Sequence, residues 1–111
     1  MDEAKFSRYL EALEEDGYCI VDNAIEPSLL DEVRKSVARL ETDLNIEPRG
    51  NRAEGFATKR MYNLLGKDRV FWKLPVHPNV LPFAERLLDE ECLLSGTTCM
   101  NIGPGEVHQG L

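Results

Sequence analysis

The most restrictive feature of this sequence is a long amphipathic stretch between Pro27 and Leu44. Its apolar residues recur at the spacing of one face of an α-helix, and charged residues fill the other face. Pro27 suits the first helical turn, where its missing N–H needs no partner. The apolar stripe consists of Leu29, Leu30, Val33, Val37, Leu40 and Leu44. We expect this helix to bury the stripe in a core rather than to present it to a cofactor.

Two further helices are predicted from the same periodicity. The first spans the apolar positions Phe6, Tyr9, Leu10 and Leu13 and ends at Gly17, since glycine tolerates the left-handed conformation common at helix C-termini. The other begins near His77-Pro78 and keeps its apolar side through Leu88, with Pro82 in its first turn. A short helix or turn is predicted at residues 68–74.

Strand-like segments lie between the predicted helices. Residues 18–21 and 92–102 are rich in β-branched, aliphatic and cysteine residues and are followed by turn residues. The predicted extended segments are residues 18–21, 57–65 and 92–102, with a surface loop at 45–55 and a turn at 103–105. The order of elements predicts an α+β fold and a single domain over residues 1–111, or the beginning of one.

Composition narrows the class of protein. The 20 acidic and 13 basic residues give a net charge of −7, which argues against nucleic acid as a partner because phosphate contacts require Lys and Arg. No apolar run approaches the roughly 20 residues of a membrane span, and the first residues do not read as a signal peptide. The cysteines, Cys19, Cys92 and Cys99, fit no CxxC pattern. These features predict a cytoplasmic protein with reduced thiols, and Cys19 and Cys92 are predicted to be core residues.

The usual catalytic and metal-binding motifs are missing. The sequence contains no GxGxxG, P-loop, HExxH, EF-hand or GxSxG pattern. His77 and His108 are its two histidines, and neither begins a His-x-Asp or His-x-Glu. We expect His77 to be a helix-start or surface residue and His108 to be a loop residue. This chain alone therefore predicts no set of ligands for iron, which in oxygenases is held by two histidines and one carboxylate.

The order of the segments nevertheless resembles that of the phytanoyl-CoA dioxygenase family. The similarity extends over the whole chain and includes an acidic-Gly-aromatic strand, a long helix, a basic extended segment, a His-Pro-x-Val-Leu helix, a Gly-Pro-Gly turn and a Gln-x-Leu segment. In this sequence they correspond to residues 15–22, 27–44, 59–64, 77–88, 103–105 and 109–111. In the family, the last segment runs directly into the His-x-Asp that supplies the first two iron ligands.

This resemblance implies a fold and an activity. Family members fold as a double-stranded β-helix, a jelly roll of two facing sheets, and the chain would supply its flanking helices and first strands. The activity implied is iron(II)- and 2-oxoglutarate-dependent hydroxylation of a small organic or acyl substrate by the full-length protein. The first ligand histidine would follow Leu111, so the chain as given is expected to be inactive. The sequence names neither the substrate nor the oligomeric state.

Three residues correspond to cofactor-pocket positions of the family. Arg60 stands where the family has a basic residue near the 2-oxoglutarate carboxylate, and a guanidinium suits a carboxylate because it donates two parallel hydrogen bonds. Cys99 stands on a strand that lines the pocket. Gln109 precedes the expected ligands and could orient them by hydrogen bonding. The competing interpretations are a surface cation for Arg60, a core residue for Cys99 and a solvent-facing side chain for Gln109.

Two other functions remain open at this stage. The chain could be a small acidic α+β module without catalysis, with apolar helix faces that bind a partner. It could also belong to an enzyme of the same fold that has lost its iron ligands. Binding of iron and 2-oxoglutarate by the full-length protein would distinguish this pseudoenzyme from an active oxygenase.

Overall fold

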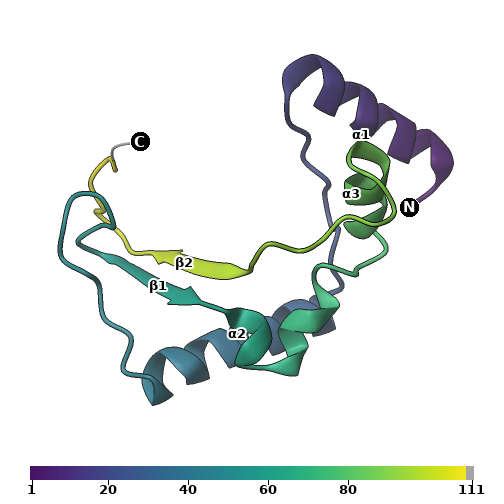
Figure 1. Cartoon of the computed structure of the whole chain (residues 1–111). Helices are drawn as coiled ribbons and strands as arrows, with labels where there is room; N and C mark the ends of the chain where they lie inside the picture. The colour runs from purple at the N-terminus through teal and green to yellow at the C-terminus, as the bar shows by residue number, and fades with distance from the viewer. Residues whose placement is uncertain (110–111) are drawn as a thin grey trace.

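The protein combines three α-helices with one two-stranded sheet in the computed structural model, which describes residues 1–109 (Figure 1). This is the predicted α+β class. In chain order the elements are α1 (Glu3–Asp16), α2 (Pro27–Asp43), β1 (Thr58–Tyr62), the short 3-10 helices η1 (Leu64–Gly66) and η2 (Arg69–Lys73), α3 (Leu81–Leu87) and β2 (Thr98–Ile102).

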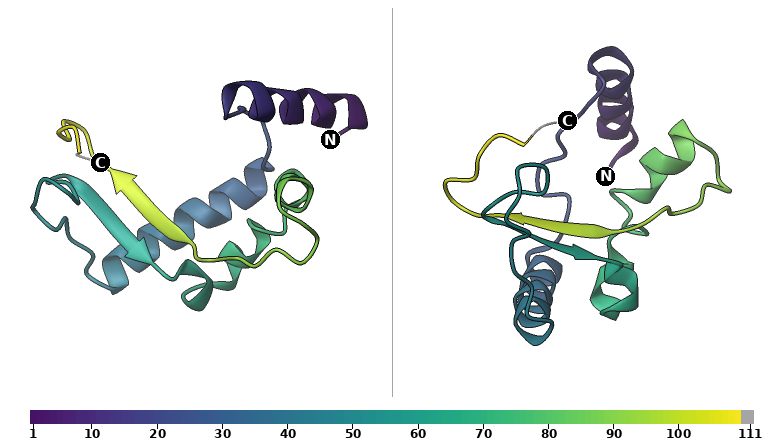
Figure 2. Two further views of the ribbon diagram at one scale, coloured as in Figure 1. Left: turned by 45° about the horizontal axis from the view of Figure 1, so that its top comes forward. Right: turned by 60° about the vertical axis from the view of Figure 1, so that its left-hand side comes forward.

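The two strands pair antiparallel although the helical segments η1, η2 and α3 lie between them in the sequence. Their register places Met61 opposite Cys99 and Arg60 opposite Met100. Since successive side chains of a strand point to opposite faces, Met61 and Cys99 share one face and Arg60 and Met100 the other. Helix α2 lies along the first of these faces (Figures 1 and 2).

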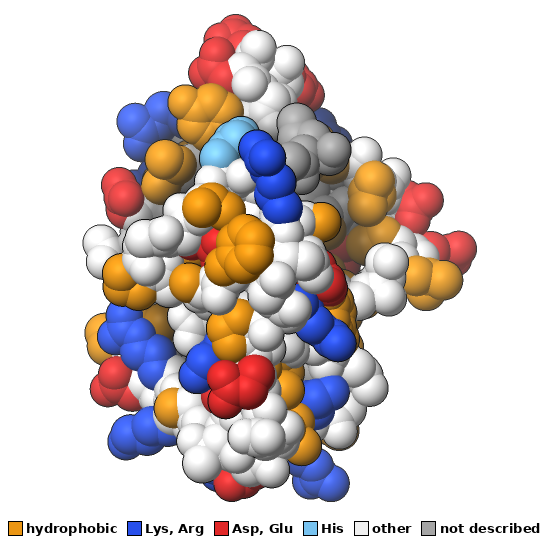
Figure 3. Space-filling view, turned by 90° about the vertical axis from the view of Figure 1, so that its left-hand side faces the viewer, with side chains coloured by type: hydrophobic (Ala, Val, Ile, Leu, Met, Phe, Trp, Pro, Cys, Tyr) orange, Lys and Arg blue, Asp and Glu red, His pale blue; other side chains and the backbone are white. Residues whose placement is uncertain are grey.

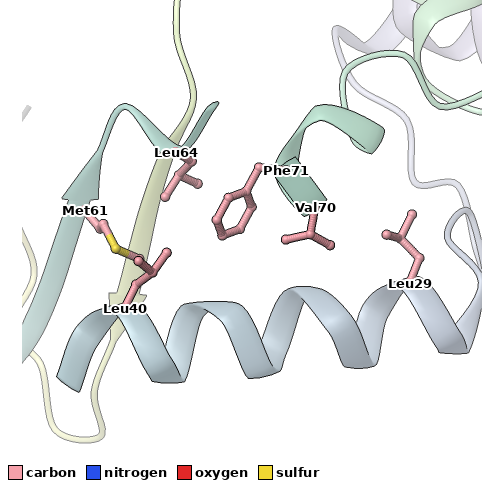
Figure 4. Close-up of a cluster of buried hydrophobic side chains, with 6 residues drawn as sticks. All are labelled: Leu29, Leu40, Met61, Leu64, Val70 and Phe71. Atoms are coloured by element: carbon pink, nitrogen blue, oxygen red, sulfur yellow. The ribbon is translucent and has the colours of Figure 1, made fainter. Parts of the chain in front are cut away.

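The hydrophobic core lies between α2, β1 and the two 3-10 helices. Its six buried hydrophobic residues are Leu29, Leu40, Met61, Leu64, Val70 and Phe71 (Figure 4). Phe71 is the most deeply buried, with 1% of its surface exposed. The apolar stripe of α2 is thus confirmed as core at four of its six positions, because Leu29 and Leu40 are buried and Val33 and Val37 pack against the cluster. The prediction was wrong for Leu30 and Leu44, which are exposed.

Asp68 ties α2 to η2 beside this core. Its carboxylate accepts a hydrogen bond from the Ser36 hydroxyl (2.6 Å) and forms an ion pair with Arg39 (2.8 Å), both on α2. It also caps η2 by accepting from the Val70 N–H (3.0 Å). The hydrogen bond from Ser36 is the largest of the effects that lower the pKa of Asp68. Ser36 and Arg39 of α2 are therefore joined to the start of η2 beside the core.

Helices α1 and α3 pack on each other through aromatic rings rather than on the main core. Phe6 and Phe83 have ring centroids 4.8 Å apart, and Tyr9 meets Phe83 at 6.3 Å. Helix α1 ends as predicted at Gly17, which has a φ of 82°. The radius of gyration, 16.2 Å, exceeds the roughly 13 Å expected of a compact domain of this length. The molecule is therefore an open arrangement of elements (Figure 2).

Several predictions from the sequence were wrong in extent. Residues 18–21 pair with no strand among the described residues, and Tyr18 and Ile20 are exposed. The strand predicted over residues 92–102 is confined to Thr98–Ile102. Cys19 and Cys92 are only half-buried. These segments have residues that favour strands, but a strand also requires a neighbouring strand with which to form hydrogen bonds, and β-propensity does not supply one.

His77 is buried rather than on the surface, with 5% of its area exposed. Its Nδ1 accepts from the Asn79 N–H (3.1 Å), which leaves Nε2 to donate to the Glu26 carboxylate (3.0 Å). This hydrogen bond is the main reason that the pKa of Glu26 is lowered. His77 therefore joins the start of α2 to the turn that precedes α3.

The second face of the sheet is not covered by any helix or strand of residues 1–109 (Figures 1 and 2). We call it the bare face. It presents three exposed large apolar side chains, Tyr62, Met100 and Ile102. The described part of the chain contains no helix that is long and apolar enough to cross a membrane.

Replacing Phe71 by alanine should unfold the region between α2 and β1. A buried phenylalanine contributes about 3–5 kcal/mol, and the core has few other members to compensate. We expect the dispersion of the amide NMR spectrum to collapse. Leu93→Ala, at a side chain that is 92% exposed, is the control that should leave the spectrum unchanged. A dispersed spectrum for Phe71→Ala would show that the core does not depend on this ring.

The bare face should make the chain self-associate, because an exposed apolar face beside unpaired strand edges favours edge-to-edge pairing. Ile102, 64% exposed, lies on it. Ile102→Lys should lower the apparent mass measured by light scattering at high protein concentration. Leu93→Lys, which removes an exposed apolar side chain outside the sheet, is the matched control. Equal effects of the two variants would mean that the sheet is not the associating surface.

Candidate functional site

The candidate site lies where the segment after β2 returns to the beginning of β1. Four polar side chains meet there, and we call them the polar cluster. They are Thr58, Arg60, Glu106 and Gln109. The turn at residues 104–105 reverses the chain as predicted, and the Gly103 N–H donates to the Ala57 carbonyl (2.8 Å). This bond places the segment that contains Glu106 and Gln109 against β1.

Glu106 is the most highly coordinated member of the polar cluster. Its Oε1 accepts from the backbone N–H groups of Phe56 (3.0 Å) and Val107 (3.0 Å). Its Oε2 accepts from the Ala57 N–H (2.6 Å) and from the Thr58 hydroxyl (2.7 Å). Four donors thus converge on one carboxylate.

These donors favour the ionised form of Glu106. The Thr58 hydroxyl has the largest effect and the backbone N–H groups add to it, so that the pKa falls from 4.5 to about 2 although partial burial opposes the fall. At neutral pH, Glu106 therefore carries a fixed negative charge.

Arg60 and Gln109 are directly bonded. The Arg60 Nη2 donates to Gln109 Oε1 (2.8 Å), and its Nε donates to the Glu54 carbonyl (3.0 Å). Gln109 in turn donates through Nε2 to the Thr58 hydroxyl (3.2 Å). Arg60 is therefore held at both ends of its guanidinium on the bare face. Neither residue is a freely solvated side chain.

Gly55 allows the polar cluster to close. A Cβ at this position would lie 2.6 Å from Glu106 Oε2, 2.7 Å from Thr58 Oγ1 and 2.8 Å from Gln109 Nε2. The residue also has a φ of 97°, which side chains rarely adopt. Both its space and its conformation therefore require glycine.

Cys99, the third residue suggested by the resemblance, does not join the polar cluster. It lies opposite Met61 on the covered face and packs against the core. Burial raises the pKa of its thiol, and the nearby charge of Glu41 adds to the rise. The sheet thus separates Cys99 from Arg60 and Gln109, and its partly buried position against the core agrees with the core interpretation that the sequence left open.

The described residues do not form a metal site. No three of their His, Cys, Asp and Glu side chains come together in a way that could hold a metal ion. His77 is engaged with Glu26, whereas His108 lines a shallow surface pocket with Arg52, Phe56 and Val107. Hydrophobic and charged side chains alternate on this end of the molecule (Figure 3). Gly110 and Leu111, which complete the Gln-x-Leu segment, lie outside the described residues.

An apolar groove lies elsewhere, between α3, η2 and the segment before β2. Its volume is about 630 Å³, and no charged side chain lines it. Among its walls are Trp72, Leu81, Leu88 and Leu93. Apart from the side chains of Ser95 and Cys92 and the indole N–H of Trp72, its lining is apolar, so it is mainly a surface for apolar contacts.

Sequence reasoning missed Thr58, Glu106 and Gly55. Each stands in an unremarkable local context: a threonine in a strand, an acid after a turn and a glycine in a polar loop. They become a site only because the pairing of β1 with β2 brings residues 55–58 next to residues 106–109. If the register between residues 58–62 and 98–102 had been known, the cluster could have been predicted from the sequence.

Comparisons of the chain with models of known protein families, with curated proteins and with solved structures found no match.

The lowered pKa of Glu106 predicts a specific response to acid. The stability that the hydrogen bonds of the Glu106 carboxylate contribute should be fully present above its unfolded-state pKa near 4.5. It should be lost as the pH falls through the folded-state pKa of about 2. The amide proton shifts of Phe56 and Ala57, which report on this carboxylate, should stay constant from pH 7 to about 4 and change only below that. Glu106→Gln should abolish the transition at these amides. A midpoint near 4.5 would contradict the hydrogen bonding described here.

Proposed function

We propose that the chain is the N-terminal part of an iron(II)/2-oxoglutarate-dependent oxygenase of the phytanoyl-CoA dioxygenase type. The observation that carries this proposal is the position of Arg60, whose guanidinium lies on the bare face of the sheet and is bonded to Gln109. These are two of the three residues that the resemblance assigns to the cofactor pocket. Their proximity was not implied by their separation in sequence.

The open architecture is consistent with a larger jelly-roll domain. A sheet with one bare face and two outer edges lacks the second sheet that would face it in a double-stranded β-helix. The exposed Tyr18 and Ile20, in a strand-like segment that pairs with no strand of residues 1–109, would likewise pair with further strands. In this arrangement the bare face forms part of the inner wall of the barrel.

Arg60 fits 2-oxoglutarate, whereas the described residues do not fit iron. The guanidinium offers planar donors to a carboxylate, and Nη1 meets only the weak acceptor Met100 Sδ, at 3.5 Å, among the described residues. The proposal assigns the iron ligands to residues after Leu111. Bound together, iron and 2-oxoglutarate supply the oxidation of a substrate C–H bond by O₂. In this chain, Arg60 would orient the dicarboxylate, and Tyr62 and Ile102 would keep water from the pocket.

The coding sequence after codon 111 tests the proposal directly. A His-x-Asp or His-x-Glu at the next codon, followed later by a histidine and an arginine, is the expected result. The polypeptide that includes them should release succinate from 2-oxoglutarate in the presence of iron(II). An immediate stop codon would overturn the proposal, because the described residues cannot hold iron.

Arg60→Met should then raise the KM for 2-oxoglutarate by about tenfold or more, since a charge-assisted hydrogen bond contributes about 1.5–3 kcal/mol. Lys59→Met is the matched control, because this neighbouring cation lies on the covered face of the same strand. Equal KM values for the two variants would exclude Arg60 from the dicarboxylate site.

The apolar groove favours a second function. A non-catalytic module could bind an apolar segment of a partner protein between α3 and the segment before β2. A stop codon after codon 111 would favour this function. A continuing sequence without iron ligands would favour the pseudoenzyme, which would bind neither iron nor 2-oxoglutarate at the proposed site.

A further inference from the structure

We infer that Glu106 is a positioning residue, whose charge sets the direction of a hydrogen-bond relay through Thr58 and Gln109 to the guanidinium of Arg60. The existence of the relay is independent of the proposed function. The identity of the anion that Arg60 would bind rests on the proposed function.

The direction of the relay follows from the number of protons available. A hydroxyl has one proton to donate, and Thr58 is bonded to both Glu106 Oε2 (2.7 Å) and Gln109 Nε2 (3.2 Å). The carboxylate can only accept, because Glu106 is ionised. Thr58 must therefore donate to Glu106 and accept from Gln109.

The orientation of the Gln109 amide follows in turn. With its NH₂ group donating to Thr58, its carbonyl oxygen points toward Arg60, whose Nη2 donates to it across 2.8 Å. A reversed amide would place NH₂ against a guanidinium, and two donors cannot bond to each other. The charge of Glu106 thus determines, through Thr58, that the side-chain carbonyl oxygen of Gln109 faces Arg60.

Glu106 also fixes the backbone that carries Gln109. Between Gly103, bonded to Ala57, and Gln109, the attachment of this segment to β1 comes from the Glu106 carboxylate. A glutamine at position 106 would keep one acceptor oxygen but turn its NH₂ toward a donor. Glutamine therefore has the right size and the wrong hydrogen-bonding pattern.

A merely structural role would not require this direction. Thr58 is buried, and valine has nearly the same shape, so Thr58→Val removes the hydroxyl while preserving much of the packing. Thr58→Ser keeps the hydroxyl and loses a methyl group. The relay predicts that serine retains the orientation of Gln109 and valine does not, whereas packing alone gives no reason for that difference.

The test follows the side-chain NMR signals of the Arg60 guanidinium, whose Nη2 is bonded to Gln109, and of the Gln109 NH₂ in the labelled chain. Glu106→Gln and Thr58→Val should shift both signals, Thr58→Ser should restore them, and the amides of Val70 and Phe71 in the core should stay in place. Gly55→Ala, which forces a Cβ into the cluster, should shift the same two signals. Gly50→Ala is the matched control, since Gly50 has a φ of 71° and open space around it.

Titration with 2-oxoglutarate of the polypeptide that continues past Leu111, with a divalent metal ion present, separates the inference from the proposed function. The wild-type Arg60 signal should move, and Glu106→Gln should weaken the apparent affinity by up to about tenfold, the effect expected of losing one hydrogen bond. If the wild type does not respond but the variants shift the relay signals, the proposed function fails and the inference stands. Unchanged Arg60 and Gln109 signals in Glu106→Gln, or a shift that extends to Phe71, would overturn the inference.

Discussion

Burial of Phe71 between α2 and β1 is the interaction on which the rest of the structure depends. It joins the long helix to the strand, and Leu40 and Met61 extend the contact along the sheet (Figure 4). Because one helix covers one face, the sheet has a covered and a bare side, and each residue of a strand is assigned to one of them by its parity. That assignment separates Cys99, which packs in the core, from Arg60, which faces outward.

The same pairing of β1 with β2 creates the polar cluster. The strands bring the loop before β1 next to the segment after β2, where the Glu106 carboxylate accepts from the backbone N–H groups of Phe56 and Ala57. This carboxylate supplies the acceptors that a neighbouring strand would supply to these N–H groups. The cluster thus combines two tasks, closing the open end of a small sheet and holding the guanidinium of Arg60 on the bare face.

Local patterns predicted α1 and α2 well, because periodicity and end signals are local. The third helix, predicted from His77-Pro78, begins only at Leu81. The stripe of α2, the end of α1 at Gly17 and the turn at residues 104–105 required no long-range information. Residues 18–21 failed as a strand since strand formation depends on a partner that β-propensity does not supply. The burial of His77 was not predicted because it results from tertiary packing, and its hydrogen-bond partner Glu26 is distant in sequence. Arg60 and Gln109 were suggested by the resemblance, but Glu106 and Thr58 emerge only from the register.

The requirement for glycine at position 55 defines part of a sequence signature for this site. Its missing side chain is the space into which Glu106, Thr58 and Gln109 fit. The site can therefore be written as two short patterns, Gly-x-x-Thr at residues 55–58 and Glu-x-x-Gln at residues 106–109. Each pattern is common by itself, but a chain that carries both, separated by a helical segment and joined by antiparallel strands, has the means to build the same cluster. This paired signature offers a way to recognise distant relatives whose overall sequences have diverged.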